Sequence, residues 1–279
     1  MSNLTDYLSV EECSIDRDCI GERWVAKNQE DLAALVAIIA MGQVAQASYI
    51  LTELAQAAPA YTDTDLKNEA KIRLTVQDNK TTPRTGYPRE HRDGFIFEVV
   101  SWIAARKFHS KLVYMKDPHI STTSQGLDGL MVELSVDKSK IERITIFEDK
   151  CSDNPRDAFT RKVIPAFLDR HRNKRSAEII AAASVLLRIA GISDGHAAQL
   201  AAAVTDRKTR RYRAAFAVTD EYDNQKKRGE LFAGYDKIED IEAEQRLGAC
   251  LIVPPNLRDW FDKLATISIE YLDSMENNV

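Results

Sequence analysis

Two short apolar segments separated by a polar stretch place the strongest constraint on the fold of this chain. Residues 130–136 and 143–150 have the composition of β-strands, and the stretch between them, Asp137-Lys138-Ser139-Lys140, has the composition of a turn. This arrangement predicts two strands joined as a hairpin. Residues with a helical period come before and after the hairpin, so the sequence predicts an α/β fold with a mixed central sheet flanked by helices.

Further elements are expected on both sides of the hairpin. The sequence predicts helices at 94–107, 155–170, 176–190, 196–204 and 256–272, and strands at 111–115, 212–219 and 249–253. Asn154 followed by Pro155 is an ordinary helix start, and Pro165 is expected to kink the helix that begins there. Gly191 stands where a helix C-terminus is expected.

The first third of the chain is expected to be mainly helical. Residues 28–58 keep a helical period and predict one long helix or two adjacent ones, ended by Pro59. Residues 67–88 are polar and contain several helix breakers, so a boundary is expected there. The predicted division is an N-terminal, mainly helical region at 1–88 and a main α/β domain at 89–279.

Composition narrows the class of protein without choosing a function. The formal net charge is −5, so contact with a polyanion has to come from local basic clusters. The four cysteines, at 13, 19, 151 and 250, lack the spacing of a structural zinc site, and the polar N-terminus lacks a secretory pattern. The apolar stretch at 32–41 is about half as long as a membrane span. We therefore expect a soluble, cytoplasmic protein with reduced thiols and no membrane contact.

Charged residues at the end of the second predicted strand form the candidate site. Alternate residues of a strand face the same side, so Glu148 and Lys150 share one face with the apolar residues before them. If the hairpin is centred near residues 138 and 139, opposing residue numbers sum to about 277. That register places Asp128 opposite residue 149 and within reach of Glu148 and Lys150.

Two carboxylates held this close repel each other unless a cation neutralises them. A hard divalent ion takes oxygen ligands, so Asp128 and Glu148 are candidate ligands for an ion that activates water and neutralises charge on a phosphodiester. Lys150 could orient that water or stabilise the transition state. Glu98, among apolar residues of a predicted helix, is a third candidate ligand or else one half of a structural ion pair.

Outside these candidates, some residues have an expected structural role, and for the basic clusters two roles stay open. Asp149 faces away from Glu148 and is expected to be structural, whereas Ser152 and Cys151 lack the neighbours that nucleophilic catalysis requires. His109, His119, His171 and His196 are scattered and form no hydrolase triad. Two basic clusters could contact a phosphate backbone or be solvated faces: Arg156, Arg161, Lys162, Arg170, Arg172, Lys174 and Arg175, and then Arg207, Lys208, Arg210, Arg211 and Arg213.

In chain order, the candidate residues resemble the PD-(D/E)xK (restriction-endonuclease-like) nuclease superfamily. The resemblance covers about residues 90–175: a helix with Glu98, Gly-x-Asp128, Glu148-x-Lys150 and a following helix, with Leu127 where the family pattern has proline. It implies a Mg²⁺- or Mn²⁺-dependent deoxyribonuclease with that core in residues 89–279. Asp128 and Glu148 would be metal ligands, Lys150 the catalytic lysine and Glu98 a helix glutamate near the metal.

More narrowly, the chain resembles the HamA-like (anti-bacteriophage protein A) family, the nuclease subunits of the Hachiman antiphage defence system. The similar features are the length, Gly-Phe-Ile-Phe-Glu98, Gly-Leu-Asp128-Gly and Phe-Glu148-Asp-Lys150-Cys-Ser. This resemblance implies DNA as the substrate and a HamB-like helicase as the partner that releases the nuclease.

Two alternatives stay open on the same fold. One is a sequence-specific restriction endonuclease, normally a homodimer. The other is a non-catalytic DNA-binding or regulatory subunit, against which the complete set of Asp128, Glu148 and Lys150 argues.

Overall fold

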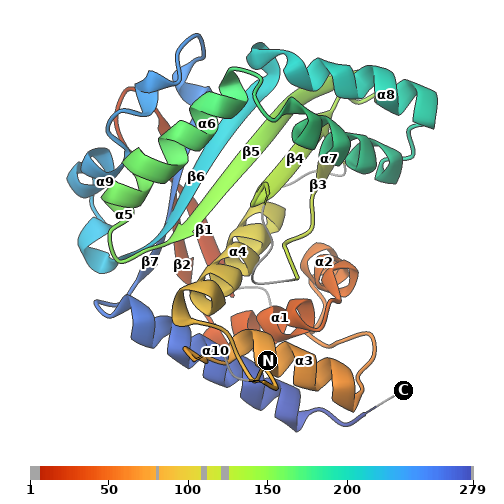
Figure 1. Cartoon of the computed structure of the whole chain (residues 1–279), viewed down its shortest axis with the longest axis vertical. Coiled ribbons are helices and arrows are strands. Elements are labelled where there is room, and N and C mark those ends of the chain that lie inside the picture. Colours follow the sequence, from red (N-terminus) through yellow and green to blue (C-terminus); the bar gives the residue numbers. More distant parts are fainter. Residues whose placement is uncertain (1–6, 80–81, 108–111, 121–125, 278–279) are drawn as a thin grey trace.

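A seven-stranded mixed sheet forms the centre of the molecule (Figure 1). The computed structural model describes residues 7–79, 82–107, 112–120 and 126–277. The strand order in the sheet is β1-β2-β7-β6-β5-β4-β3. The strands are β1 (Leu8–Ser14), β2 (Ile20–Ala26), β3 (Val113–Met115), β4 (Gly129–Leu134), β5 (Ile141–Cys151), β6 (Arg210–Thr219) and β7 (Arg246–Val253). The two outer pairings on one side, β3–β4 and β4–β5, and the β1–β2 pairing on the other are antiparallel, and β2, β7, β6 and β5 run parallel. The expected α/β class with a mixed sheet is confirmed.

Helices cover both faces of this sheet. They are α1 (Gln29–Ala40), α2 (Val44–Glu53), α3 (Thr64–Leu74), α4 (Arg89–Lys107), α5 (Pro155–Ala158), α6 (Ile164–His171), α7 (Ser176–Ile189), α8 (Asp194–Ala202), α9 (Gln225–Phe232) and α10 (Leu257–Ser274). Helices α1, α2, α3, α4 and α10 enclose one hydrophobic core with side chains such as Phe147, Ala215 and Leu251. Helices α5 to α9 enclose a second core with Ile146, Phe216 and Cys250. The result is a three-layer arrangement of helices, sheet and helices.

The central strands read as continuous apolar runs because both of their faces are covered. Strand β6 is buried from Tyr212 to Val218, and Ala214 and Phe216 pack in one core whereas Ala215 and Ala217 pack in the other. The small alanines let helices approach the sheet closely on that side. These strands hold the candidate site in a rigid frame.

The N-terminal region contains helices, as predicted, and two strands that the prediction missed. The helical run at 28–58 divides into α1 and α2 at Gly42, whose φ of +81° suits glycine. Strand β2 pairs with β7, more than two hundred residues further along the chain. Residues 7–79 therefore share a sheet and a core with the rest of the protein, and the predicted domain boundary near residue 88 stays a prediction.

The remaining predicted elements occur close to their expected places. The strand expected at 111–115 is observed from Val113, and Lys111 lies outside the described residues, as does His109. The predicted helix at 155–170 consists of α5, a π-helical turn at Phe159–Val163, and α6. Because Pro165 has no N–H to donate to the preceding turn, the chain widens into the π-helical turn there. None of the helices in the described ranges is both long enough and apolar enough to cross a membrane.

Candidate active site

The end of β5 and the turn before β4 bring together three predicted site residues. The ammonium Nζ of Lys150 lies 2.6 Å from Oδ2 of Asp128 and 2.9 Å from Oε2 of Glu148. It also donates to the carbonyl oxygen of Asp149 at 3.1 Å. The side chains of Asp128 and Lys150 are 24% and 25% exposed, and Glu148 is buried. The predicted convergence is confirmed as geometry, and the chemical roles of these residues stay predictions.

The strand register differs by one residue from the expected one. Gly129 pairs with Phe147, so extending this register places Asp128 opposite Glu148 instead of Asp149. The pairing shifts further along the hairpin, between Glu133 and Leu134, which the assumed regular turn did not include. The amide nitrogen of Asp149 nevertheless donates to Oδ2 of Asp128 at 2.9 Å, and this bond holds the carboxylate beside the β5 side chains.

Two glycines shape the backbone around Asp128. Gly126 has a φ of +138°, and a Cβ atom there would lie 2.9 Å from Oε1 of Glu178. A Cβ on Gly129 would lie 2.5 Å from the Phe147 ring. Both positions therefore require glycine, so that the turn can pass close to α7 and to β5. This turn-shaping role is compatible with a functional site between the two glycines.

Arg170 on α6 is a site residue that the sequence prediction assigned to another role. Its guanidinium Nη1 donates to Oε1 of Glu148, while Lys150 contacts the other oxygen of the same carboxylate. The Arg170 side chain is only 2% exposed, so it is not an exposed DNA contact as the first basic cluster suggested. A signal was present in the sequence, because Val163, Phe167 and Arg170 are spaced by four and three residues and so share one helix face, which is buried.

Lys150 remains a cation in this environment. Burial by itself lowers the pKa of an ammonium group, but the carboxylates of Asp128 and Glu148 outweigh burial and raise the pKa of Lys150 above its ordinary value. Lys150 can therefore donate hydrogen bonds and neutralise negative charge, and it does not act as a proton acceptor in this arrangement.

The donor chemistry at this position fits a hard divalent cation. One oxygen each of Asp128 and Glu148 and the carbonyl oxygen of Asp149 converge on a single cationic atom, Nζ of Lys150. Mg²⁺ takes oxygen ligands of these types, commonly one or two carboxylates completed by water. Within the described ranges, no group of three or more His, Cys, Asp or Glu side chains is placed to hold a metal ion. The fit therefore rests on two carboxylates and one backbone carbonyl.

Glu98 on α4 contacts a histidine. Its Oε1 accepts from the backbone nitrogen of His119 at 2.7 Å and lies 2.9 Å from Nδ1 of the same residue. Nε2 of His119 lies 2.9 Å from Nζ of Lys116, which also donates to the carbonyl oxygen of Leu127 at 3.1 Å. Burial lowers the pKa of Lys116, although nearby carboxylates oppose this effect. The structure thus places Glu98 in hydrogen-bonding contact with His119, which holds the segment next to Asp128, and its role as a metal ligand stays a prediction.

His119 and Lys116 were not identified as site residues from the sequence. Neither has a local motif, because Glu98 precedes His119 by more than twenty residues and the contact forms only when α4 packs beside the segment after β3. The chain of hydrogen bonds implies a neutral imidazole that donates from Nδ1 to Glu98 and accepts at Nε2 from the Lys116 ammonium.

Asp149 lies on the opposite face of β5, as predicted. Its carboxylate is buried 3.4 Å from the guanidinium of Arg213, which in turn donates to the Ser101 hydroxyl. Burial raises the pKa of Asp149 to about 7, with Asp128 adding to the shift and Arg213 opposing it. Its contacts are those of an internal ion pair, which fits the expected structural role.

The two predicted basic clusters divide into buried and exposed members. Three members are buried, and their guanidinium groups donate hydrogen bonds to internal partners: Arg170, Arg210 and Arg213. Their suggested role as phosphate contacts is therefore wrong. Arg211 donates to the backbone carbonyl of Glu244. The exposed members include Arg172, Lys174, Arg175, Arg207 and Lys208.

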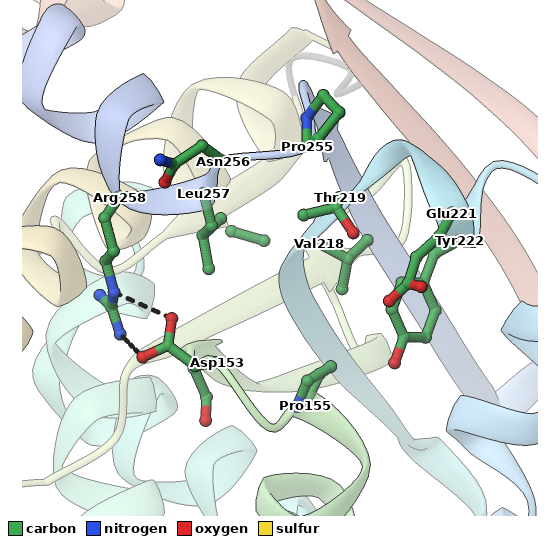
Figure 2. A pocket seen from close by; sticks show the side chains of 12 residues that line it. Asp153, Pro155, Val218, Thr219, Glu221, Tyr222, Pro255, Asn256, Leu257 and Arg258 are labelled. Carbon is green, nitrogen blue, oxygen red and sulfur yellow. Dashed lines mark hydrogen bonds and ion pairs between the residues drawn. The ribbon is translucent and has the colours of Figure 1, made fainter.

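A separate pocket lies at the carboxyl ends of β5, β6 and β7 (Figure 2). Its volume is about 270 Å³, and Asp128, Glu148, Lys150 and Glu98 are not among its lining residues. Figure 2 shows Arg258 directed at Asp153, and the guanidinium donates to both oxygens of Asp153, at 3.0 and 2.8 Å, and to buried Asp93 at 2.6 Å. Arg258 is the single Lys or Arg among the described residues that line the pocket. Because its guanidinium is already paired with two carboxylates, this pocket is poorly suited to a phosphate group.

Comparisons of the chain with protein-family models, with curated proteins and with solved structures find no match.

Proposed function

We propose that the chain is a metal-dependent nuclease that hydrolyses phosphodiester bonds in DNA. The observation that carries the proposal is the convergence of Asp128, Glu148 and the Asp149 carbonyl on one cationic atom, Nζ of Lys150. The helix with Glu98, the Asp128 turn, the Glu148-x-Lys150 strand and a following helix also occur in the order expected for a PD-(D/E)xK core.

Each residue of the candidate site has a separate role in the proposed reaction. Asp128 and Glu148 would hold Mg²⁺ or Mn²⁺, which when bound supplies Lewis-acid activation of water and neutralises charge on the phosphate. Lys150, kept protonated by its neighbours, stabilises the extra negative charge that develops on the phosphate in the transition state. Arg170 fixes the orientation of Glu148 through Oε1 and leaves Oε2 directed toward the site.

We extend this proposal to the biological setting that the sequence suggests. In the HamA-like interpretation the chain is the nuclease of an antiphage defence complex, and a HamB-like helicase restrains it until infection. The support for this extension is the resemblance of the segments around Glu98, Asp128 and Glu148 to that family. Uncontrolled cleavage would damage the host genome, which gives a reason for such restraint.

The test is cleavage of plasmid DNA in Mg²⁺ or Mn²⁺, by the chain alone and with any co-encoded helicase. The inactive variant is Glu148→Ala/Lys150→Ala. A matched control is Lys140→Ala/Glu142→Ala, which removes an exposed ion pair of 2.9 Å from the other end of the same hairpin. We expect metal-dependent cleavage that the first variant loses and the control retains.

The fragment pattern distinguishes two kinds of nuclease, and the absence of cleavage distinguishes a nuclease from a binding subunit. Discrete bands would indicate a site-specific restriction endonuclease, and a smear would indicate general degradation. Absence of cleavage with either metal and with the partner present would overturn the catalytic proposal and leave the binding-subunit alternative.

A further inference from the structure

Five exposed cations of the two basic clusters lie on two chain segments that contact each other in the fold. The basic rim is defined here as Arg172, Lys174, Arg175, Arg207 and Lys208. Asn173, within the first segment, donates to the carbonyl oxygen of Thr205, beside the second segment, at 3.4 Å. Arg210 at the start of β6 reaches back and donates to Oδ1 of Asn173 and to the carbonyl oxygen of Arg170. Segments that are more than thirty residues apart in the chain thus lie side by side.

The first segment of this rim, Arg172 to Arg175, lies between two contacts with the candidate site. At one end, the segment begins at Arg170, whose guanidinium contacts Glu148. At the other end, Arg175 lies 3.1 Å from Glu178, and Glu178 is so close to Gly126 that a Cβ atom there would lie 2.9 Å from Oε1. Gly126 is two residues before Asp128. The chain from Arg170 to Glu178 therefore runs along the site from one carboxylate to the turn that carries the other.

The cations of the rim are available to an external anion. Arg172, Arg207 and Lys208 are exposed, and the structure gives none of the three an ion pair with a described residue. Lys174 pairs with Asp169 in an exposed and hence weak ion pair, whereas Arg175, itself exposed, pairs with the partly buried Glu178. An incoming phosphate can replace Asp169 at little cost.

We propose that the basic rim binds the sugar–phosphate backbone of a polynucleotide on the flank of the cleaved bond. The inference rests on the proposed nuclease function and deepens it, because it names the surface that holds the phosphates next to the cleaved bond. A backbone laid along the rim delivers one phosphate to Asp128 and Glu148 while neighbouring phosphates contact the exposed cations. Such contacts position a nucleic acid without reading its sequence.

The test is binding of a fluorescently labelled DNA duplex of about 24 base pairs, measured by anisotropy in EDTA so that cleavage does not interfere. The rim variant is Arg207→Gln/Lys208→Gln. The control, Lys226→Gln/Lys227→Gln, removes the same charge from exposed lysines at the start of α9. A second rim variant, Arg172→Gln/Lys174→Gln, changes the other segment, and thermal melts check that all variants fold.

We expect both rim variants to bind at least about tenfold more weakly than the control at about 0.1 M salt. Each lost phosphate contact removes about 0.9 from the slope of log affinity against log salt, so each double variant should lower that slope by up to about 1.8. Equal losses in rim and control variants would overturn the proposal, as would wild-type chain that does not bind the duplex at low salt. If the chain never cleaves DNA but the folded rim variants lose DNA binding, the rim proposal is supported and the nuclease proposal is refuted. If the chain cleaves DNA and the rim variants bind it as tightly as the wild type, the nuclease proposal is supported and the rim proposal is refuted.

Discussion

Arg170 offers the sharpest test of how the site is held together. Its guanidinium is 2% exposed and pairs with Glu148, which is 8% exposed. The Arg170 Nε has no hydrogen-bond partner among the described residues, so the carboxylate is the main compensation for burying this charge. Arg170→Met keeps much of the side-chain volume and removes the guanidinium.

The expected cost follows from burial and from the partner that remains. Removing one member of a buried ion pair destabilises a protein by about 3–5 kcal/mol. Glu148 keeps Lys150 at 2.9 Å, which places the expected loss near the lower end, at about 3 kcal/mol. A chain of this size loses about 2 °C in melting temperature for each kcal/mol, so a fall of about 6 °C is expected.

The assay is urea unfolding combined with a double-mutant cycle. Arg161→Met is the matched control, since Arg161 lies in the same helical stretch but is 79% exposed and pairs with Asp157 on the surface, so it should cost less than about 1 kcal/mol. Glu148→Gln and the double variant complete the cycle, and we expect a coupling energy above about 1 kcal/mol. If Arg170→Met costs no more than Arg161→Met, or if the cycle is additive, the ion pair does not hold Glu148 in place.

Two further predictions concern the residues around the site. In the unfolded chain Asp149 ionises near its ordinary pKa of 3.8, whereas burial raises its pKa in the folded chain to about 7. The folded state therefore keeps the proton to a higher pH, and the free energy of unfolding falls as pH rises between these two values. Relative to Asp149→Asn, the wild type should therefore lose at most about 4 kcal/mol between about pH 4 and pH 8, measured by urea unfolding; parallel pH profiles would contradict this. Glu98→Ala removes both contacts to His119, which should cost about 1.5–3 kcal/mol and accelerate hydrogen exchange of the His119 amide; unchanged exchange would show that Glu98 does not hold this segment.

Local periodicity was sufficient to predict the core of the site. Alternation along β5 placed Glu148 and Lys150 on one face and Asp149 on the other, and the structure agrees because a strand has little freedom to do otherwise. The register was wrong by one residue because the turn lies earlier in the chain than assumed: Leu134 pairs with Ile141, and the shift between Glu133 and Leu134 removes only part of the difference. The error did not separate the site residues because the Asp128 carboxylate is bonded to the β5 backbone itself.

Features that depend on distant partners could not be predicted. Strand β1 is half exposed at the edge of the sheet, and its polar residues conceal the strand pattern. Strand β2 is defined by parallel pairing with β7, which no local pattern reports. Likewise, Arg210 and Arg213 belong to a run of basic residues that looks solvated, and only tertiary contacts show that they are internal.

The charges at the site are balanced before any metal is considered. Two carboxylates, Asp128 and Glu148, face two cations, Lys150 and Arg170. A divalent ion that uses these carboxylates must therefore replace part of an existing ion pair. Arg170 is 2% exposed and fixed within the core, whereas Lys150 has a flexible side chain that is 25% exposed, so Lys150 is the cation that can yield its place at least cost. Metal affinity and the position of the Lys150 ammonium are thus coupled, and Lys150→Ala should bind Mn²⁺ more tightly than the wild type while losing catalysis. Weaker Mn²⁺ binding by Lys150→Ala, measured by calorimetry, would refute the competition.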